Sequence, residues 1–426
     1  MLPARIIAVR MLVYAAKHLL PVASAPIQSG AVATHEGRIV AVGRRKDVVK
    51  AHPGVEVREL GDAVIVPGLI NAHTHVELSF MNGDPPAGGT FMSWIRDLVH
   101  RRSQVAPASA LEAATKSIEG MIARGTVAVG DVANEAWIAP LLARSSLHGL
   151  AFYELFGFRA AETEAKLDQA AARLDAIDSD PAVRAAAGRI TTVLTPHAAH
   201  TTSSPLLKAL GGRAIASAEV LSIHVAESEE ETQLLRDGTG AFKDFLIERD
   251  AWEPGWKAPG LTPVEYLDRL GVLTPRTLAV HCIHLDHQDV SRLQARGVTV
   301  VTCPRSNQRL GVGKAPVSKL MASGIPVALG TDSLASSPDV DVFTEIAHLR
   351  QEHPGLSPAA ALRIATLNGA RALGMGDELG SIEVGKRDLL AVVGLNDPND
   401  DPLESVTWSS ETVAPLSQAL WEPATR

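Results

Sequence analysis

The chain has 426 residues, of which 46% are hydrophobic and 21% charged, a composition that excludes wholesale disorder. Its 40 basic and 48 acidic residues give a net charge of −8, and no dense run of Lys and Arg predicts nucleic-acid binding. Two cysteines are too few for a disulfide framework and fit a reducing compartment. No run of about 18 apolar residues predicts a membrane span. We therefore expect a cytoplasmic protein that binds neither nucleic acid nor membrane.

The N-terminal 66 residues are typical of short strands and turns, with strand-like segments at 30–33 and 38–42. Residues 11–16, followed by Ala23-Ser24-Ala25, partly match a secretory signal. Lys17 and His18 interrupt that apolar run, and strand-like residues follow it directly. We interpret the segment as a first strand and a loop.

From Pro67 onward, compact apolar runs alternate with longer helical patterns. Continuous apolar runs are typical of parallel strands that are covered on both faces. Helical patterns such as 108–124, 162–177 and 288–296 lie between them. The chain therefore predicts an α/β protein whose residues 67–375 form a (β/α)8 TIM barrel. The eight predicted barrel strands are residues 69–75, 127–132, 150–155, 190–196, 221–226, 278–283, 298–303 and 326–331.

After the predicted barrel, the pattern returns to short strand-like pieces at 380–385 and 389–393. These pieces would pair with the N-terminal strands. We therefore expect a small β-sandwich domain built from both ends, residues 1–66 and 376–426. Within the barrel, residues 238–260 look like an irregular insertion.

Histidines gather at the ends of the predicted barrel strands. His73 and His75 are two residues apart on the first strand, so both side chains point to the same face. Catalytic groups of such barrels lie at the carboxyl ends of the strands. Five of the fifteen histidines and one aspartate fall on that rim, a clustering that favours a metal site over scattered surface histidines. These residues are His73, His75, His197, His224, His281 and Asp332.

The residue types narrow the choice of metal. Imidazole and carboxylate ligands without thiolate suit Zn²⁺, and Fe²⁺ is the alternative. A catalytic zinc keeps one position open for water and lowers the pKa of that water to about 7. A second metal would need a bridging anion, and residues 195–197 hold no lysine to supply one. We expect one metal ion per chain.

Glu227 follows His224 by three residues, so a regular strand would place the two side chains on opposite faces. The chain must leave strand geometry for both to face the barrel mouth. There, Glu227 would be an acid beside a metal-activated water, placed to move protons. We interpret the neighbouring run, residues 229–231, as an exposed acidic helix start that the helix dipole favours.

Together these motifs resemble the amidohydrolase superfamily, and most closely its mononuclear branch of deaminases and s-triazine chlorohydrolases. The resemblance covers nearly the whole chain, including residues 37–43 and 380–388. The motifs that carry it are residues 67–75, His224 with Glu227, residues 280–282 and residues 329–333. They are jointly specific for the superfamily and weak on substrate.

The resemblance implies a role for each motif residue. Glu227 would be the proton shuttle, and His281 would orient or polarise the attacking water. Asp332 would bind the metal and also accept the proton of that water. His197 matches a substrate-contacting histidine of adenosine-type deaminases, whereas a tyrosine often stands at the position of His200. The implied metal ligands are His73, His75, His224 and Asp332.

Within the branch, residues 73–79 are similar to the first-strand motif of aminodeoxyfutalosine deaminases, enzymes of the futalosine route to menaquinone. Residues 303–307 after the seventh strand, and Phe91 with Trp94, fit the same group. For each further candidate, a surface salt bridge or a loop cap is the alternative reading. The implied substrate-binding residues are His197, Glu77, Glu154, Arg305 and Asn307.

We therefore expect a hydrolase acting on non-peptide carbon–nitrogen bonds, a cyclic amidine deaminase of a 6-aminopurine nucleoside-like small molecule. Metal-bound hydroxide would attack the amino-bearing ring carbon. The same site could serve guanine, adenosine or S-adenosylhomocysteine deamination, or s-triazine chlorohydrolysis, because all of them need an activated water. A non-catalytic barrel scaffold is the alternative from another class, and metal analysis separates it from an enzyme. The resemblance also allows a homo-oligomer.

Overall fold

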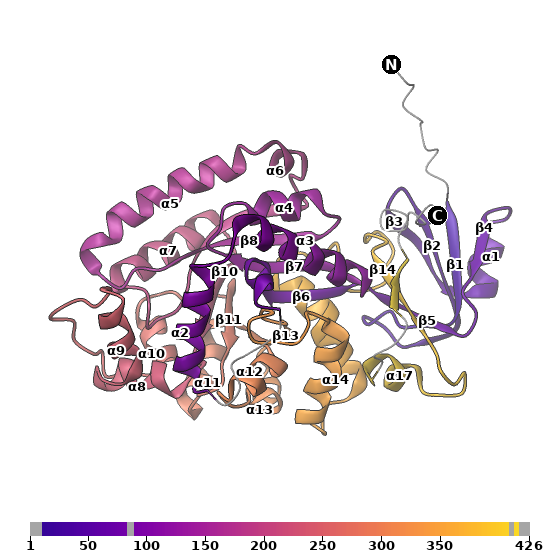
Figure 1. Ribbon diagram of the computed structural model, residues 1–426. Coiled ribbons are helices and arrows are strands. Elements are labelled where there is room, and N and C mark those ends of the chain that lie inside the picture. The colour runs from indigo at the N-terminus through magenta and orange to yellow at the C-terminus, as the bar shows by residue number, and fades with distance from the viewer. Residues whose placement is uncertain (1–10, 83–88, 409–412, 417–426) are drawn as a thin grey trace, which may run out of the picture.

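The computed structural model describes residues 11–82, 89–408 and 413–416. Residues 1–10 and 417–426, which the sequence assigns to the small β domain, lie outside the described residues. A barrel of strands and helices forms the larger part of the molecule, and a sheet made from both ends of the chain lies at one side of it (Figure 1).

Eight parallel strands form the barrel, and all eight lie where the sequence predicts them. They are arranged as two four-stranded sheets, β6-β7-β8-β9 and β10-β11-β12-β13. Isolated bridges join the two sheets at both seams, one between Thr74 and Asp332 and one between Ala198 and His224. The strands are β6 (Leu69–Thr74), β7 (Thr126–Ala133), β8 (His148–Leu155), β9 (Ile190–Pro196), β10 (Leu221–Val225), β11 (Thr277–His281), β12 (Thr299–Thr302) and β13 (Val327–Leu329).

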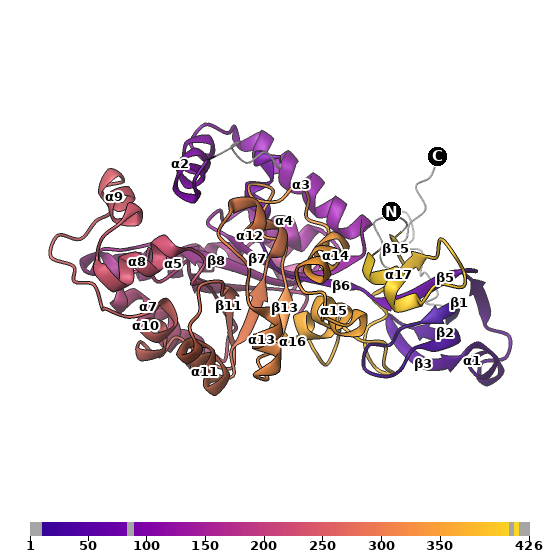
Figure 2. The same ribbon diagram turned by 90° about the horizontal axis from the view of Figure 1, so that it is seen from below.

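Helices pack around these strands, as Figure 2 shows from below. Every residue of β6, β7, β10, β11, β12 and β13 is buried, which is why these strands read as continuous apolar runs. The described helices are α1 (Arg45–Ala51), α2 (Phe91–Arg102), α3 (Pro107–Ala123), α4 (Ile138–Arg144), α5 (Thr163–Asp178), α6 (Pro181–Ala185), α7 (Ser204–Ser217), α8 (Glu229–Asp237), α9 (Ala241–Glu248), α10 (Pro263–Arg269), α11 (His287–Arg296), α12 (Pro304–Leu310), α13 (Val317–Ala322), α14 (Val342–Glu352), α15 (Pro358–Arg363), α16 (Gly369–Ala372) and α17 (Pro402–Trp408).

A seven-stranded sheet combines both ends of the chain. Its order is β15-β14-β5-β1-β2-β3, and β4 pairs with β1. The sequence favours a β-sandwich here, whereas the described strands belong to one connected sheet. The strands are β1 (Leu12–Leu19), β2 (Ile27–His35), β3 (Arg38–Arg44), β4 (Glu56–Glu59), β5 (Ala63–Pro67), β14 (Leu390–Gly394) and β15 (Val413–Pro415).

Two local predictions need correction. Residues 380–385 form turns rather than a strand, because Gly380 and Gly385 have left-handed φ angles of 86° and 94°. Residues 238–260 include the helix α9, where an irregular insertion was expected. One face of α9 is apolar, since Phe242 and Leu246 are buried. Within the described residues, no helix is long and apolar enough to cross a membrane.

Candidate metal centre and active site

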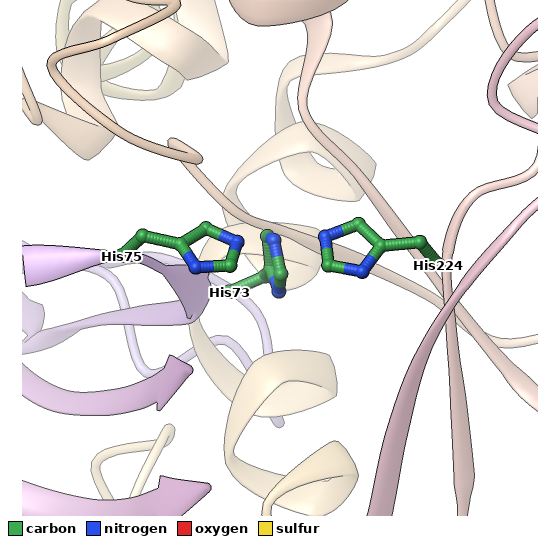
Figure 3. Close-up of side chains that lie close together, drawn as sticks. All are labelled: His73, His75 and His224. Carbon is green, nitrogen blue, oxygen red and sulfur yellow. The ribbon is translucent and has the colours of Figure 1, made fainter. Parts of the chain in front are cut away.

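Three histidines converge at the barrel mouth, as Figure 3 shows. His73 and His75 come from β6 and its end, and His224 from β10. One ring nitrogen from each lies within 4.8 Å of the others, a spacing that allows one ion to bind all three. All three side chains are buried.

The hydrogen bonds of these histidines leave nitrogens available for a metal. Nδ1 of His224 lies 3.0 Å from the carbonyl oxygen of His197. A carbonyl only accepts, so Nδ1 carries the hydrogen and Nε2 keeps its lone pair. Neither nitrogen of His73 has a hydrogen-bond partner, although the side chain is fully buried. Such a buried orphan is costly unless a ligand satisfies it, and its place among two other imidazoles fits a metal ion.

Burial keeps the three imidazoles neutral. Burial and the neighbouring His75 and His224 hold the pKa of His73 well below its usual value. Burial also lowers the pKa of His75 to about 4, against the opposing effect of Asp332. Burial and the nearby His281 lower the pKa of His224. Metals bind the neutral imidazole, so the site is preset in the metal-binding form.

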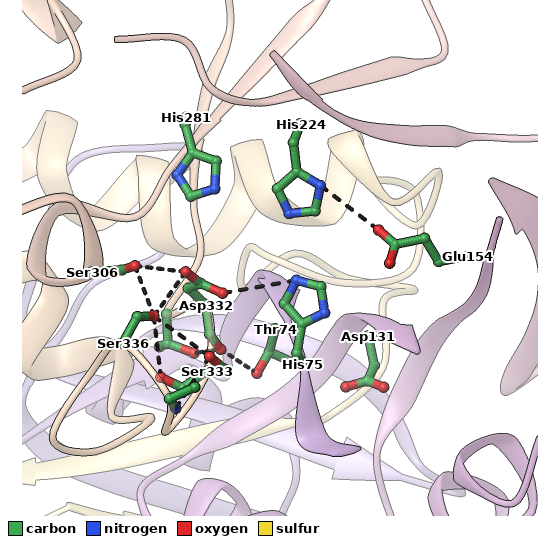
Figure 4. Close-up of polar contacts among 12 residues, drawn as sticks. Thr74, His75, Asp131, Glu154, His224, His281, Ser306, Asp332, Ser333 and Ser336 are labelled. Atoms are coloured by element: carbon green, nitrogen blue, oxygen red, sulfur yellow. Dashed lines mark hydrogen bonds and ion pairs between the residues drawn. The ribbon is translucent and has the colours of Figure 1, made fainter. Parts of the chain in front are cut away.

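Asp332 completes the cluster from the end of β13, as Figure 4 shows. Its backbone is left-handed, with φ of 57°, and its Oδ1 lies 3.8 Å from Nε2 of His75. Its Oδ2 accepts hydrogen bonds from Ser306 Oγ at 2.6 Å and Ser336 Oγ at 2.9 Å. Burial alone would raise the pKa of Asp332, but His75, His281 and the Ser306 hydroxyl together lower it. The two serine hydroxyls hold Oδ2, and Oδ1 is directed toward the histidines.

A left-handed residue just after β10 brings Glu227 to the barrel mouth, where the three histidines also lie. β10 ends at Val225, and Ala226 adopts a left-handed φ of 51°. A regular strand would place Glu227 and His224 on opposite faces. Because the chain leaves strand geometry at Ala226, both side chains line one pocket. Glu227 Oε1 lies 3.5 Å from Nε2 of His281, and burial raises the pKa of Glu227 to about 7.

His281 is oriented by Asn307. Its Nδ1 lies 2.8 Å from Asn307 Oδ1, so the amide oxygen accepts the Nδ1 hydrogen and Nε2 faces Glu227. Asn307 therefore lies behind His281 and is absent from the pocket lining. Arg305 also lies outside this lining, because its guanidinium pairs with Asp339 at 2.6 Å. The sequence-based assignment of Arg305 and Asn307 to the substrate pocket thus has no geometric support.

The other three predicted substrate residues do line the pocket: His197, Glu77 and Glu154. Burial raises the pKa of Glu77 to about 7 and, together with Glu77, that of Glu154 to about 8. Glu154 Oε1 lies 3.7 Å from Nδ1 of His224, the nitrogen that already bonds the His197 carbonyl. These groups therefore line the pocket beside the metal cluster, and their roles toward a substrate stay predictions.

The sequence did not predict the contacts that several further residues make with the site. Glu231 was expected on the surface, but its side chain is fully buried and its Oε2 accepts a hydrogen bond from the Glu227 backbone amide at 2.9 Å. Ser306 and Ser336 hold Asp332, and Arg102 pairs with Glu77 at 3.0 Å. Only Ser306 had a signal, since it lies within the 303–307 motif. Glu231 and Ser336 lie only four residues after the groups that they contact, Glu227 and Asp332, but the direction of their side chains becomes visible only in the fold.

The model of the amidohydrolase family matches residues 64–416. The chain belongs to the amidohydrolase family. It is therefore a hydrolase that acts on carbon–nitrogen bonds, as the sequence predicts, and this family is metal-dependent.

Named relatives agree with this placement. The chain is 32% identical over 392 residues to a 5-methylthioadenosine/S-adenosylhomocysteine deaminase of Nitratidesulfovibrio vulgaris, covering 88% of this chain and 81% of the relative. It is 34% identical over 352 residues to an aminodeoxyfutalosine deaminase of Deinococcus radiodurans, covering 79% and 80%. A solved adenosine deaminase of Xanthomonas campestris with bound zinc superposes with a TM-score of 0.79 at 27% identity, covering 93% of this chain and 89% of that one.

Proposed function

We propose that this amidohydrolase is a metal-dependent hydrolytic deaminase of a 6-aminopurine nucleoside-like substrate. The convergence of His73, His75 and His224 beside Asp332, with both nitrogens of His73 unpartnered, carries the proposal. The names of the relatives supply the substrate class, because both curated relatives are deaminases of adenosine-like compounds.

His73, His75, His224 and Asp332 would hold the ion, which we propose to be one zinc per chain. Nitrogen and carboxylate donors without thiolate suit zinc, and ferrous iron accepts the same set. When bound, the ion supplies Lewis acidity that lowers the pKa of a water to about 7.

The protein residues supply the proton transfers. Asp332 accepts the proton of the attacking water, and His281, fixed by Asn307, orients that water. Glu227 lines the pocket and donates a proton to the ring nitrogen next to the attacked carbon. The carbon–nitrogen bond then breaks, and Asp332 and Glu227 return the proton with which the amino group leaves as ammonia.

One relative is named for 5-methylthioadenosine and S-adenosylhomocysteine, and the other for aminodeoxyfutalosine. The similarity of residues 73–79 to the first-strand motif of aminodeoxyfutalosine deaminases favours aminodeoxyfutalosine, a compound of the menaquinone route, as the substrate. Deamination of guanine, adenosine or S-adenosylhomocysteine, and s-triazine chlorohydrolysis, use the same activated water. The cytoplasmic location and the oligomeric state stay predictions.

Ammonia release from purified, zinc-loaded protein tests the proposal. We expect turnover of at least one 6-aminopurine nucleoside, and chloride release from a chlorotriazine serves as the competing assay. Glu227→Gln should retain zinc but lose turnover, since the amide cannot transfer the proton. Fully metal-loaded protein that releases no ammonia from any aminopurine would overturn the proposal. A metal-free native protein would favour the scaffold instead.

A further inference from the structure

His200 lies in the turn that follows β9, and the backbone on both sides of it is fixed. Two residues before it, Ala198 forms a bridge with His224. Two residues after it, Thr202 forms a bridge with Gly157. The turn therefore holds His200 in a defined position at the barrel mouth, where its buried side chain lines the pocket.

Ring contacts connect the metal cluster with helix α9 through His200. The ring centroids of His224 and His197 are 4.8 Å apart, and those of His197 and His200 are 5.8 Å apart. The ring of His200 also packs on Phe242 of α9, with the centroids at 4.1 Å. The series leads from a metal-binding histidine to a helix outside the barrel strands, and His200 belongs to its outer part.

Glu231 determines which ring nitrogen of His200 carries the hydrogen. Its Oε1 lies 3.7 Å from Nδ1 of His200, and its Oε2 accepts the hydrogen bond of the Glu227 backbone amide at 2.9 Å. That hydrogen bond and the N-terminus of α8 both favour the ionised carboxylate. A carboxylate oxygen only accepts, so the hydrogen of the neutral imidazole belongs on Nδ1.

The other ring nitrogen of His200 is therefore an acceptor. Nδ1 is fully buried and has no hydrogen-bond partner among the described residues, so Nε2 is the nitrogen that a ligand in the pocket can reach. With the hydrogen on Nδ1, Nε2 keeps its lone pair and needs a donor.

Few groups of a 6-aminopurine nucleoside can supply that donor. The ring nitrogens N3 and N7 are acceptors, and N9 carries the ribose. In the proposed reaction the 6-amino group lies at the metal cluster, and N1 takes its proton from Glu227. The remaining donors are the hydroxyls of the ribose, which is also the part of the substrate remote from the reacting carbon.

Resting on the proposed deaminase function, we propose that His200 is a substrate-binding residue whose Nε2 accepts a hydrogen bond from a ribose hydroxyl. A nucleoside without that hydroxyl leaves the lone pair of Nε2 without a donor and binds less tightly. His200 therefore sets specificity for the sugar rather than for the purine ring.

Steady-state kinetics on nucleosides that lack single hydroxyls test this contact. The substrates are adenosine and its 2′-, 3′- and 5′-deoxy forms, or, where a 5′-substituted nucleoside reacts faster, that compound and its 2′- and 3′-deoxy forms. We expect one deletion to lower kcat/KM of the wild-type protein about tenfold, chiefly through KM, because a remote hydroxyl is bound alike in the ground and transition states. Equal kcat/KM across the set would overturn the inference while ammonia is still released. Failure of the proposed function means no ammonia from any of these compounds.

Variants of His200 connect the hydroxyl with this residue. His200→Leu should lower kcat/KM for the parent nucleoside about tenfold and leave that for the sensitive deoxy form unchanged, because the contact is already absent there. His200→Gln places an amide oxygen near the position of Nε2 and should recover part of the discrimination. His287→Leu makes the same change at an exposed histidine of α11 outside the pocket lining and should keep all values at the wild-type level.

A merely structural role of His200 gives a different pattern. A distorted pocket would lower kcat/KM for the parent and the deoxy form by the same factor, and that result would contradict the proposed hydrogen bond. If His200→Leu fails to fold, His200→Phe keeps a ring against Phe242 and serves as the second variant without Nε2.

Discussion

Replacing Glu231 tests how Glu227, the proposed proton donor, is held in position. Glu231 lies in the first turn of α8, after the N-cap residue Ser228, and its side chain is 0% exposed. Its Oε2 accepts the hydrogen bond from the Glu227 backbone amide at 2.9 Å, and its Oε1 lies 3.7 Å from Nδ1 of His200. Glu231→Ala removes the acceptor and leaves a buried N–H without a partner.

The expected loss follows from the cost of that orphaned group. A buried unsatisfied donor costs about 1–3 kcal/mol. If this cost displaces Glu227 from its working position, kcat falls roughly 5- to 150-fold, since about 1.4 kcal/mol corresponds to a factor of ten. KM should change less, because the carboxylate of Glu231 is not part of the pocket lining.

Ammonia-release kinetics, with zinc content measured in parallel, check this expectation. Glu231→Gln keeps a carbonyl oxygen at the end of the same side chain, so it should recover most of the lost kcat. Glu229→Gln removes a charge from the exposed neighbour and serves as the matched control. Wild-type kcat in Glu231→Ala, or equal losses in the alanine and glutamine variants, would refute the positioning argument.

Three further predictions concern the metal and the barrel. Removing the metal with a chelator should abolish turnover and lower Tm, because His73 then stays buried without a partner. Added zinc should restore both. Full activity in verified metal-free protein would contradict the proposed metal site. Gly330→Ala should weaken zinc binding, since its new Cβ would lie 2.7 Å from the His73 carbonyl oxygen, and an unchanged zinc Kd would argue against this crowding. Burial and the nearby Arg387 and Arg189 lower the pKa of His148 from 6.5 to about 4. The unfolded chain therefore gains this proton first, and the free energy of unfolding should fall by about 3 kcal/mol as the pH drops from 6.5 to 4. Urea unfolding of His148→Gln should lack that part of the decline, and curves parallel to wild type would exclude His148 as its source.

The barrel could be predicted from the sequence because its strands are buried on both faces. Their apolar runs need no alternation to be recognised, and helices separate them clearly. The convergence of His73, His75 and His224, the proposed metal ligands, could be predicted from their positions at the ends of predicted strands. The turn at 380–385 was harder to predict, because Ile382 and Val384 alternate with polar residues as they would on one face of a strand, whereas in the fold Ile382 is buried and Val384 is exposed.

Roles that depend on side-chain direction were beyond the sequence. Arg305 and Asn307 lie in one short helix after β12, and only the fold shows that Asn307 bonds His281 while Arg305 pairs with Asp339. Glu231 resembles its exposed neighbour Glu229 in sequence, and burial against the Glu227 amide separates them. The contacts of Glu227 and His281 depend on the left-handed residues Ala226 and His281 at strand ends, and local sequence propensity does not predict that conformation.

The sheet shared by both ends of the chain has a consequence for synthesis on the ribosome. β5 (Ala63–Pro67) pairs with β1 on one side and with β14 (Leu390–Gly394) on the other. The edge of β5 that pairs with β14 therefore stays without its native neighbour until the whole barrel has been translated. An unpaired apolar edge is a template for misassociation, so the nascent chain must protect it for most of its elongation. β14 thus closes the sheet that the first strands began.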